Sequence, residues 1–365
     1  MPTKLLYITN RVSGSGGLER VLSIKAGMLA ENYDYEIHII TLDQQNEALF
    51  YQFSDQLIFH DVNTKGSFWG YLKGLRNKVK SIKPDIISVC DDGLKGFFVP
   101  YFLRKPCPMI YERHASKNIF INSDNSSWVK KIQYAFYNWL MNFGGKNYDS
   151  LVVLTNENLK EWNLKNLKVI ANPLSFFPTK KATLSAKKVI AVGSHNFQKG
   201  FDRLLTIWLE VVKEFPDWKL DIYGKIDADK KYVKQAIALG LQETVSFHKP
   251  VKDIQEKYNK SSVFVLPSRS EGFGMVLIEA MANGVPCVSF ECPSGPKDII
   301  THSEDGFLVE NGNLEAFTRY LKLLMNDENL RTQMGEKARD NINRYLPEVI
   351  LPEWDYLFKS LIEKE

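Results

Sequence analysis

Short apolar runs of strand length alternate with amphipathic stretches along the whole chain, and this alternation constrains the fold more than any other feature. In the first half, apolar runs are found at residues 4–9, 36–42, 85–89, 109–111, 151–154 and 169–170. Between two of them, residues 68–82 place Phe68, Leu72, Leu75, Val79 and Ile82 on one helical face. Strands separated by helices predict an α/β fold with a doubly wound parallel sheet.

A second series of the same kind follows a polar, proline-bearing stretch. Its predicted strands are residues 188–192, 219–223, 245–247, 263–266, 285–290 and 307–309. We therefore predict a first domain over 1–173, a linker over 174–187, and a second Rossmann-like domain over 188–348. A last amphipathic helix, 349–365, is expected to return to the first domain. Ligands of such sheets bind at the carboxyl ends of strands, so the predicted site is a cleft between the two domains.

Composition excludes several classes of protein. The 365 residues include 44% hydrophobic and 25% charged residues, which is typical of a soluble globular chain. A net charge of +4 gives no reason to expect nucleic acid as a partner. The four cysteines form no CxxC pair, and no apolar run approaches the roughly 20 residues of a membrane span. We expect a cytoplasmic protein, or one peripheral on the cytoplasmic face of the inner membrane.

The segment with the most chemical information joins a buried-type strand to a helix through Glu271-Gly-Phe-Gly274. The glycines let the backbone approach a ligand closely, and a helix start offers free N–H groups to hydroxyls and phosphates. Glu279 lies in an otherwise apolar helix and needs a partner. At about 1.5 Å per residue the two carboxylates would be about 12 Å apart, the length of a nucleotide sugar. Two ordinary salt-bridged glutamates are the alternative interpretation.

The run EGFGMVLIEAMANGVP, residues 271–286, resembles the EX7E motif of glycosyltransferase family 4, whose members are retaining enzymes with the GT-B fold. The resemblance implies that Glu271 contacts the donor sugar and Glu279 the ribose hydroxyls. It implies that backbone amides hold sugar and phosphate at Phe273, Gly274, Met275 and Val276. The family needs no metal, so no metal ligands and no cofactor are expected beyond the nucleotide-sugar co-substrate.

Further segments resemble the same family. Gly16 and Gly17, in a loop after the first strand, match its GG-x-ER element, which closes over the donor phosphates and the acceptor. In its G-R-x-x-x-x-K-G element both cations neutralise the leaving diphosphate; Lys199 matches, but Ser194 stands where the family has Arg. Arg269 is the best placed candidate to compensate, with His195 and the helix start as others. Val251 lies where the family contacts the base, and His114 where it has a histidine facing the anomeric region.

Two surface segments bear on the acceptor. Residues 65–83 hold six Lys or Arg and no acid, and residues 128–143 are rich in aromatics. A basic amphipathic helix can lie on an anionic membrane, although a solvated basic face and core aromatics are the simpler interpretations. If either segment binds a membrane, the acceptor is lipid-linked.

The sequence therefore predicts a metal-independent, retaining glycosyltransferase of the hexosyltransferase type. It moves a sugar from a nucleotide diphosphate, with UDP as the default, to a glycan in polysaccharide, lipopolysaccharide or lipid-linked oligosaccharide synthesis. His114, Lys199 and Glu271 are the predicted catalytic residues. A non-catalytic sugar-nucleotide-binding subunit and a GT-B phosphorylase or epimerase remain alternatives. Asp227-Ala-Asp229 spells a metal-binding DxD, and Asp91-Asp92 is a carboxylate pair, but neither has the context of a metal site.

Overall fold

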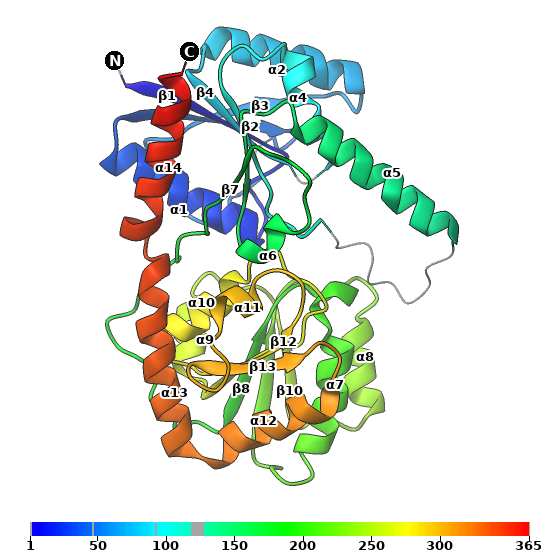
Figure 1. Cartoon of the computed structure of the whole chain (residues 1–365). Coiled ribbons are helices and arrows are strands. Elements are labelled where there is room, and N and C mark those ends of the chain that lie inside the picture. The colour runs from blue at the N-terminus through cyan, green and yellow to red at the C-terminus, as the bar shows by residue number, and fades with distance from the viewer. Residues whose placement is uncertain (1, 46, 92, 118–127, 365) are drawn as a thin grey trace. The chain divides into compact units, whose positions relative to one another are not determined.

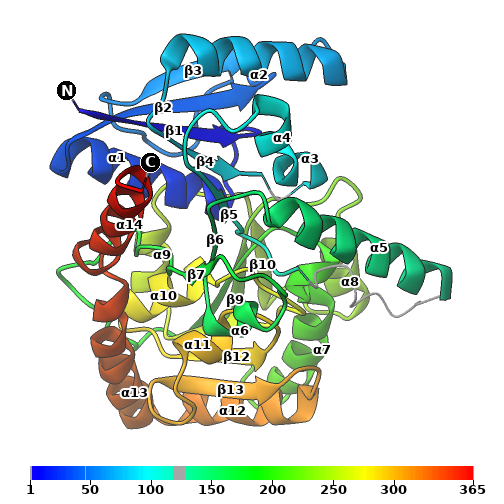
Figure 2. The same ribbon diagram turned by 45° about the horizontal axis from the view of Figure 1, so that its top comes forward.

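A computed structural model of the chain describes residues 2–45, 47–91, 93–117 and 128–364. The chain divides into two compact units: unit 1 comprises Met1–Pro173 and Pro347–Glu365, and unit 2 comprises Leu174–Leu346. Figure 1 shows the elements along the chain, and Figure 2 shows the same ribbon turned. Each unit is built around one parallel sheet with its own buried core.

Unit 1 contains a seven-stranded sheet of order β3-β2-β1-β4-β5-β6-β7, in which every pair of neighbours is parallel. Its strands are β1 (Thr3–Thr9), β2 (Tyr35–Leu42), β3 (Ile58–Val62), β4 (Ile86–Cys90), β5 (Met109–Glu112), β6 (Ser150–Val153) and β7 (Leu167–Val169). The central strands are buried on both faces, as parallel sheets between helical layers are.

Six helices within the described residues connect these strands. They are α1 (Gly17–Asn32), α2 (Phe68–Ile82), α3 (Leu94–Phe97), α4 (Val99–Leu103), α5 (Trp128–Gly145) and α6 (Asn156–Leu159). The predicted helix over 68–82 is confirmed as α2, capped by the Ser67 hydroxyl, which accepts from the Gly70 amide. Leu72, Leu75, Val79 and Ile82 are buried as predicted, whereas Phe68 is 51% exposed. Phe68 is in the first turn of α2, where its ring contacts the aromatic rings of Tyr71 and Phe102.

The C-terminal helix α14 (Pro347–Ile362) belongs to unit 1, as predicted for the returning helix. Its apolar face buries Leu351, Trp354 and Phe358. The Tyr35 hydroxyl donates a 2.8 Å hydrogen bond to Asp355, which ties α14 to the start of β2. The opposite faces of the unit 1 sheet are therefore covered by α1 with α14 and by α2 to α5.

Unit 2 contains a six-stranded parallel sheet of order β10-β9-β8-β11-β12-β13. Its strands are β8 (Lys188–Val192), β9 (Lys219–Tyr223), β10 (Val245–His248), β11 (Val263–Leu266), β12 (Cys287–Glu291) and β13 (Gly306–Glu310). Its helices are η1 (Phe197–Lys199), α7 (Phe201–Val211), α8 (Lys231–Ala238), α9 (Ile254–Asn259), α10 (Met275–Ala282), α11 (Pro296–Ile299), α12 (Leu314–Asn326), α13 (Glu328–Asn341) and η2 (Ile342–Tyr345). The prediction of two doubly wound, Rossmann-like domains is thus confirmed.

Candidate functional site

An ion pair between Lys199 and Glu271 lies at the carboxyl edge of the unit 2 sheet. The Lys199 Nζ is 2.8 Å from both carboxylate oxygens of Glu271, and the Ser268 hydroxyl donates to Glu271 Oε1 at 2.6 Å. The Glu271 side chain is only 6% exposed and that of Lys199 19%. The segments after β8 and after β11 therefore meet at a nearly buried, charge-assisted pair.

Backbone conformation holds Lys199 in this place. Gly200 has φ +68°, and a Cβ there would be 2.1 Å from the Pro267 carbonyl oxygen, so this turn admits only glycine without movement. The Asn196 side chain accepts from the Lys199 amide at 3.0 Å and caps the short helix η1. The lysine stem also packs against Gly193, whose missing side chain leaves room for it.

Arg269 lies beside this pair but is bonded elsewhere. Its guanidinium makes a bidentate ion pair with the two carboxylate oxygens of Asp202, at 2.8 and 2.6 Å. It also donates to the Phe197 carbonyl at 2.8 Å. The Arg269 group also stacks over the Phe197 ring at 3.8 Å. Burial raises the pKa of Asp202, but the hydrogen bonds and charge of Arg269 outweigh burial and lower it. These bonds tie the loop after β11 to η1 and to the start of α7.

The helix predicted after the glycines, over Met275–Ala282, is α10, so Glu271 lies before its start. Gly274 precedes it with φ +106°. As at every helix start, the first amides, at Met275 and Val276, have no acceptor inside the helix. Because Glu271 lies outside the helix, the rise per residue of a helix does not measure its separation from Glu279. The expected spacing of about 12 Å therefore had the wrong geometric basis.

Glu279 is 2% exposed, and its carboxylate accepts from two hydroxyl groups. The Ser175 hydroxyl is 2.8 Å from Oε1, and the Tyr258 hydroxyl is 3.3 Å from Oε2. The expectation that this carboxylate needs a partner is met by neutral hydroxyls. Ribose hydroxyls present the same donor group, so the carboxylate is suited to them.

The other predicted residues of unit 2 differ in their surroundings. Ser194 is exposed in the turn after β8, and Val251 is half-buried in the loop after β10. Phe273 is buried with its ring against Tyr345. His195 is 4% exposed among the rings of Phe201, Tyr232 and Phe247, and within the described residues neither ring nitrogen has a hydrogen-bond partner.

In unit 1, Gly16 and Gly17 form the start of α1, as expected for the glycine loop. The loop encloses a carboxylate of the chain itself. A Cβ at Gly16 would be 2.6 Å from Glu19 Oε2, and one at Gly14 would be 2.4 Å from Oε1. Burial raises the pKa of Glu19, partly offset by backbone hydrogen bonds and by the nearby His114. The loop and the candidate histidine thus belong to one local cluster.

His114 follows β5, and its Nε2 is 3.1 Å from Glu112 Oε2. Glu112 also accepts from Lys25 Nζ at 2.5 Å and from the Ser88 hydroxyl at 2.6 Å. Burial alone would raise the pKa of Glu112, but Lys25 and His114 lower it to about 2. Glu112 is then ionised at neutral pH. A carboxylate on Nε2 fixes the histidine ring and assigns a proton to that nitrogen.

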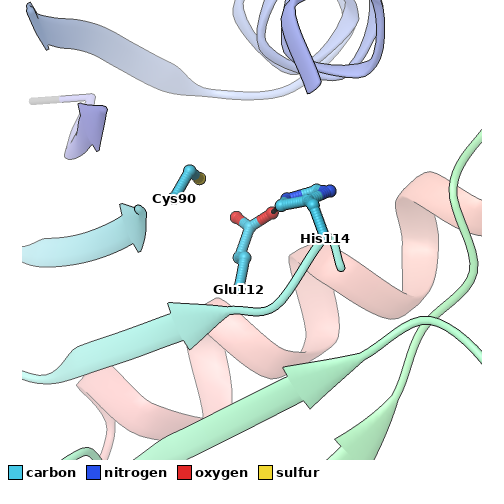
Figure 3. A group of neighbouring side chains, drawn as sticks. All are labelled: Cys90, Glu112 and His114. Atoms are coloured by element: carbon cyan, nitrogen blue, oxygen red, sulfur yellow. Dashed lines mark hydrogen bonds and ion pairs between the residues drawn. The ribbon is translucent and has the colours of Figure 1, made fainter. Parts of the chain in front are cut away.

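Figure 3 shows Cys90, Glu112 and His114 converging from the ends of β4 and β5. Their donor atoms lie within 4.8 Å of one another, a spacing at which three such groups could hold a metal ion. The Glu112 carboxylate, however, is already paired with Lys25, whose Nζ lies 3.7 Å over the Trp354 ring. The carboxylate therefore has its compensating cation within the chain. Of the carboxylate pair Asp91-Asp92 noted in the sequence, Asp92 lies outside the described residues.

Lys25 and Glu112 were not predicted as part of the site. Lys25 lies in the apolar run VLSIKAGMLA of α1, and a lone charge in such a helix is the signal that identified Glu279. The sequence did not indicate its partners, because β5 and α14 are far from it along the chain. A cavity of about 650 Å³ was also missed; it lies at the carboxyl ends of β1, β2 and β4. Its lining includes Asn10, Arg11, Glu19, Asp43, Tyr71 and Lys95.

Two parallel sheets with charged and glycine-rich turns at their carboxyl ends define an α/β protein of the GT-B type. A staphylococcal TarM mutant solved with fondaparinux, alpha-GlcNAc-glycerol and UDP has the same fold, with a TM-score of 0.81 over 98% of this chain and 99% of that one, at 16% identity. The family described as glycosyl transferases group 1 matches residues 176–341.

Relatives match over nearly the whole chain. An uncharacterized glycosyltransferase of Haemophilus influenzae is 31% identical over 361 residues, covering 96% of this chain and 98% of that protein. The amylovoran biosynthesis glycosyltransferase AmsD of Erwinia amylovora is 29% identical over 366 residues, with the same coverage. The chain therefore belongs to the group 1 glycosyltransferases.

Proposed function

We propose that this glycosyltransferase is a retaining, metal-independent hexosyltransferase of the family 4 type that uses a nucleotide-diphosphate sugar. The observation that carries the proposal is the Lys199–Glu271 pair, beside which α10 begins with amides that have no acceptor inside the helix. A cation and helix amides suit a diphosphate, and a carboxylate suits sugar hydroxyls. The family resemblance assigns these same roles.

In the reaction that we propose, the acceptor hydroxyl attacks the anomeric carbon on the face from which the diphosphate leaves. The departing phosphate oxygen takes the hydroxyl proton, so no enzymic nucleophile is needed. Lys199 and the first amides of α10 stabilise the charge that develops on the leaving group, which is usually the largest catalytic term. Glu271 orients the sugar, and Glu279 the ribose.

The donor and acceptor are proposed with the relatives as support. UDP is present in the TarM complex, and AmsD is named for amylovoran biosynthesis. We propose a UDP-sugar as donor and a growing bacterial-type glycan as acceptor. The acceptor is lipid-linked, and the enzyme binds it at the cytoplasmic face of the membrane. The unit 1 cavity, lined by carboxylates, cations and Tyr71, offers the mixed polar and aromatic groups that suit a glycan. We propose that His114, held by Glu112, supports the transition state from unit 1.

A transfer assay with a panel of nucleotide sugars and EDTA tests the reaction. We expect product with the α-anomeric configuration of an α-linked donor, measured by proton NMR, and no loss of rate with EDTA. Lys199→Ala and Glu271→Gln should each lower kcat by at least about 100-fold, the usual cost of a group acting on the transition state. Lys213→Ala, which removes an exposed ion pair with Glu210 in the same unit, is the matched control.

An inverted product, dependence on a metal, or full activity of both variants would each contradict the proposal. The alternative functions have their own signs. A phosphorylase would require inorganic phosphate, and an epimerase would release isomeric sugar nucleotides without an acceptor. A non-catalytic subunit would bind the donor without turnover. This alternative is suggested by Ser194, which stands where the family has arginine.

A further inference from the structure

The helices on one face of the unit 1 sheet have an unusual charge. We call α2 to α5 with their adjoining residues, 67–83, 94–108 and 128–148, the outer layer. These stretches contain eleven Lys or Arg residues and no Asp or Glu, in a chain that has 47 basic and 43 acidic residues. Among its exposed cations are Lys73, Arg76, Lys80, Lys83, Arg104, Lys105 and Lys146.

The outer layer also exposes large apolar side chains. Helix α5 accounts for most of them, and its residues 128, 129 and 132–140 include no buried side chain. The exposed fractions are 73% for Trp128, 58% for Ile132, 57% for Phe136, 58% for Trp139 and 44% for Phe143. The C-terminal end of α5 packs into the unit, where Met141 is buried and Gly144 lies against Phe97. Figure 1 shows the rest of α5 extending beyond the sheet.

Ring contacts join these side chains into two runs, which meet at the consecutive residues Tyr101 and Phe102 of α4. We call the two runs together the aromatic belt. Along α5, Phe136 stacks on Trp139 at 6.0 Å between ring centroids, and Trp139 on Phe143 at 5.6 Å. Phe143 stacks on Tyr101 of α4 at 6.3 Å, which carries the belt to the neighbouring helix. At its other end, Phe68 of α2, beside the 78% exposed Trp69, contacts Phe102 of α4 at 5.4 Å.

A basic hollow adjoins the aromatic belt. It has a volume of about 480 Å³ and is lined by Tyr101, Arg104, Lys105 and Lys146. Lys105 is paired with Asp149 at 2.7 Å, just beyond the outer layer. Arg104 and Lys105 both have left-handed backbone conformations, which turn the chain sharply at the end of α4. Cationic side chains thus line a hollow that adjoins the exposed aromatic side chains of the belt.

The opposite face of the same sheet does not share this pattern. Helices α1 and α14 together contain five acidic and three basic residues. Exposed aromatics on that face are scattered singly, as Tyr356 is. The combination of one charge sign with clustered aromatics therefore distinguishes the outer layer from the opposite face of the sheet.

We propose that the outer layer docks unit 1 on an anionic phospholipid bilayer. Trp, Tyr and Phe favour the boundary between headgroups and acyl chains, and Lys and Arg favour anionic headgroups. The aromatic belt enters this boundary, and the basic hollow receives a headgroup phosphate. A layer without any acid suits a surface of uniform negative charge, whereas a protein partner would present both signs. The proposal goes beyond sugar transfer and does not depend on it.

Flotation of the full-length protein with vesicles tests this docking. We expect binding to phosphatidylcholine vesicles that contain about a third phosphatidylglycerol, at least about tenfold weaker binding to phosphatidylcholine alone, and weakening by salt. The double variants Phe136→Ser with Trp139→Ser, and Arg104→Glu with Lys146→Glu, should each lower binding by at least about tenfold. Circular dichroism and UDP binding check that they fold.

Matched controls alter equally exposed residues elsewhere. Tyr356→Ser removes a 75% exposed ring from α14, and Lys234→Glu with Lys337→Glu reverses two exposed charges in unit 2. Both controls should bind vesicles as the native chain does. Absence of binding to anionic vesicles, or equal losses in variants and controls, would overturn the proposal. So would light scattering showing a dimer that the aromatic variant dissociates, because the belt would then bind a second copy.

Discussion

At the scale of single residues, we expect the buried Lys25–Glu112 ion pair to have a large effect on the stability of unit 1. Both side chains are 1% exposed, so neither charge can be solvated if the other is removed. We expect Glu112→Gln to lower the free energy of unfolding by about 3–5 kcal/mol, the usual cost of leaving a buried charge unpaired. Urea denaturation measures this loss. Lys25→Met combined with Glu112→Leu should cost less than Glu112→Gln alone.

The matched control for this prediction is Lys160→Ala, which breaks an exposed pair with Glu157. Surface pairs contribute about 0–1 kcal/mol, so this variant should be close to native. A Glu112→Gln variant as stable as Lys160→Ala would show that the pair is not essential to the folding of unit 1.

His195 makes the stability of unit 2 depend on pH. Burial lowers the pKa of His195 below its ordinary 6.5, partly offset by Asp227. The unfolded chain then binds a proton that the folded chain does not, so stability is lost as the pH falls below about 6.5. We expect His195→Phe to flatten this decline, measured as melting temperature against pH. The exposed His302→Phe is the control, and an unchanged slope in His195→Phe would contradict the prediction.

At the scale of elements, the turn at Gly200 sets the position of Lys199. Gly200→Ala introduces both a left-handed alanine and a collision with the Pro267 carbonyl. Gly240→Ala has the same backbone penalty, at φ +71°, but open space around the new methyl group. We expect Gly200→Ala to be less stable than Gly240→Ala by about 1–3 kcal/mol, the cost of overpacking. Thermal unfolding of both variants measures the difference, and equal losses would show that the turn relaxes freely.

Strands and helices could be predicted from the sequence where burial is two-sided. The central strands of both sheets are continuous apolar runs, and the pattern identified them. Strand β3 was missed because Ile58 and Phe59 are about 40% exposed at the sheet edge, and the run IFHDV contains both charged and apolar residues. Edge strands lack the apolar pattern because one side faces solvent.

The candidate site was predictable only in part, for a similar reason. Residues of one motif, such as Glu271 and Glu279, lie only eight positions apart in the sequence. The partners that hold them come from distant segments: Lys199 for Glu271, and Ser175 with Tyr258 for Glu279. The Arg269–Asp202 bond was likewise invisible, because neither residue type nor spacing selects one ion pair among many.

At the scale of the whole molecule, each unit presents a different set of groups at the carboxyl edge of its sheet. Unit 2 presents a cation, buried carboxylates and helix amides, which suit a nucleotide sugar. Unit 1 presents a polar cavity and a histidine held by Glu112 and Lys25, with α14 completing the core beneath it. Among the described residues, no helix is long and apolar enough to cross a membrane.

The most direct test of a nucleotide-sugar site in unit 2 is thermal unfolding in EDTA with UDP, GDP, ADP, TDP or NAD. A ligand at about 100 times its dissociation constant stabilises the folded state by about 2.7 kcal/mol. We predict that one nucleoside diphosphate, UDP first, raises the melting temperature of the native chain, and that Lys199→Ala abolishes the shift. Stabilisation by NAD alone, by no nucleotide, or equally in native and Lys199→Ala chains would contradict the site.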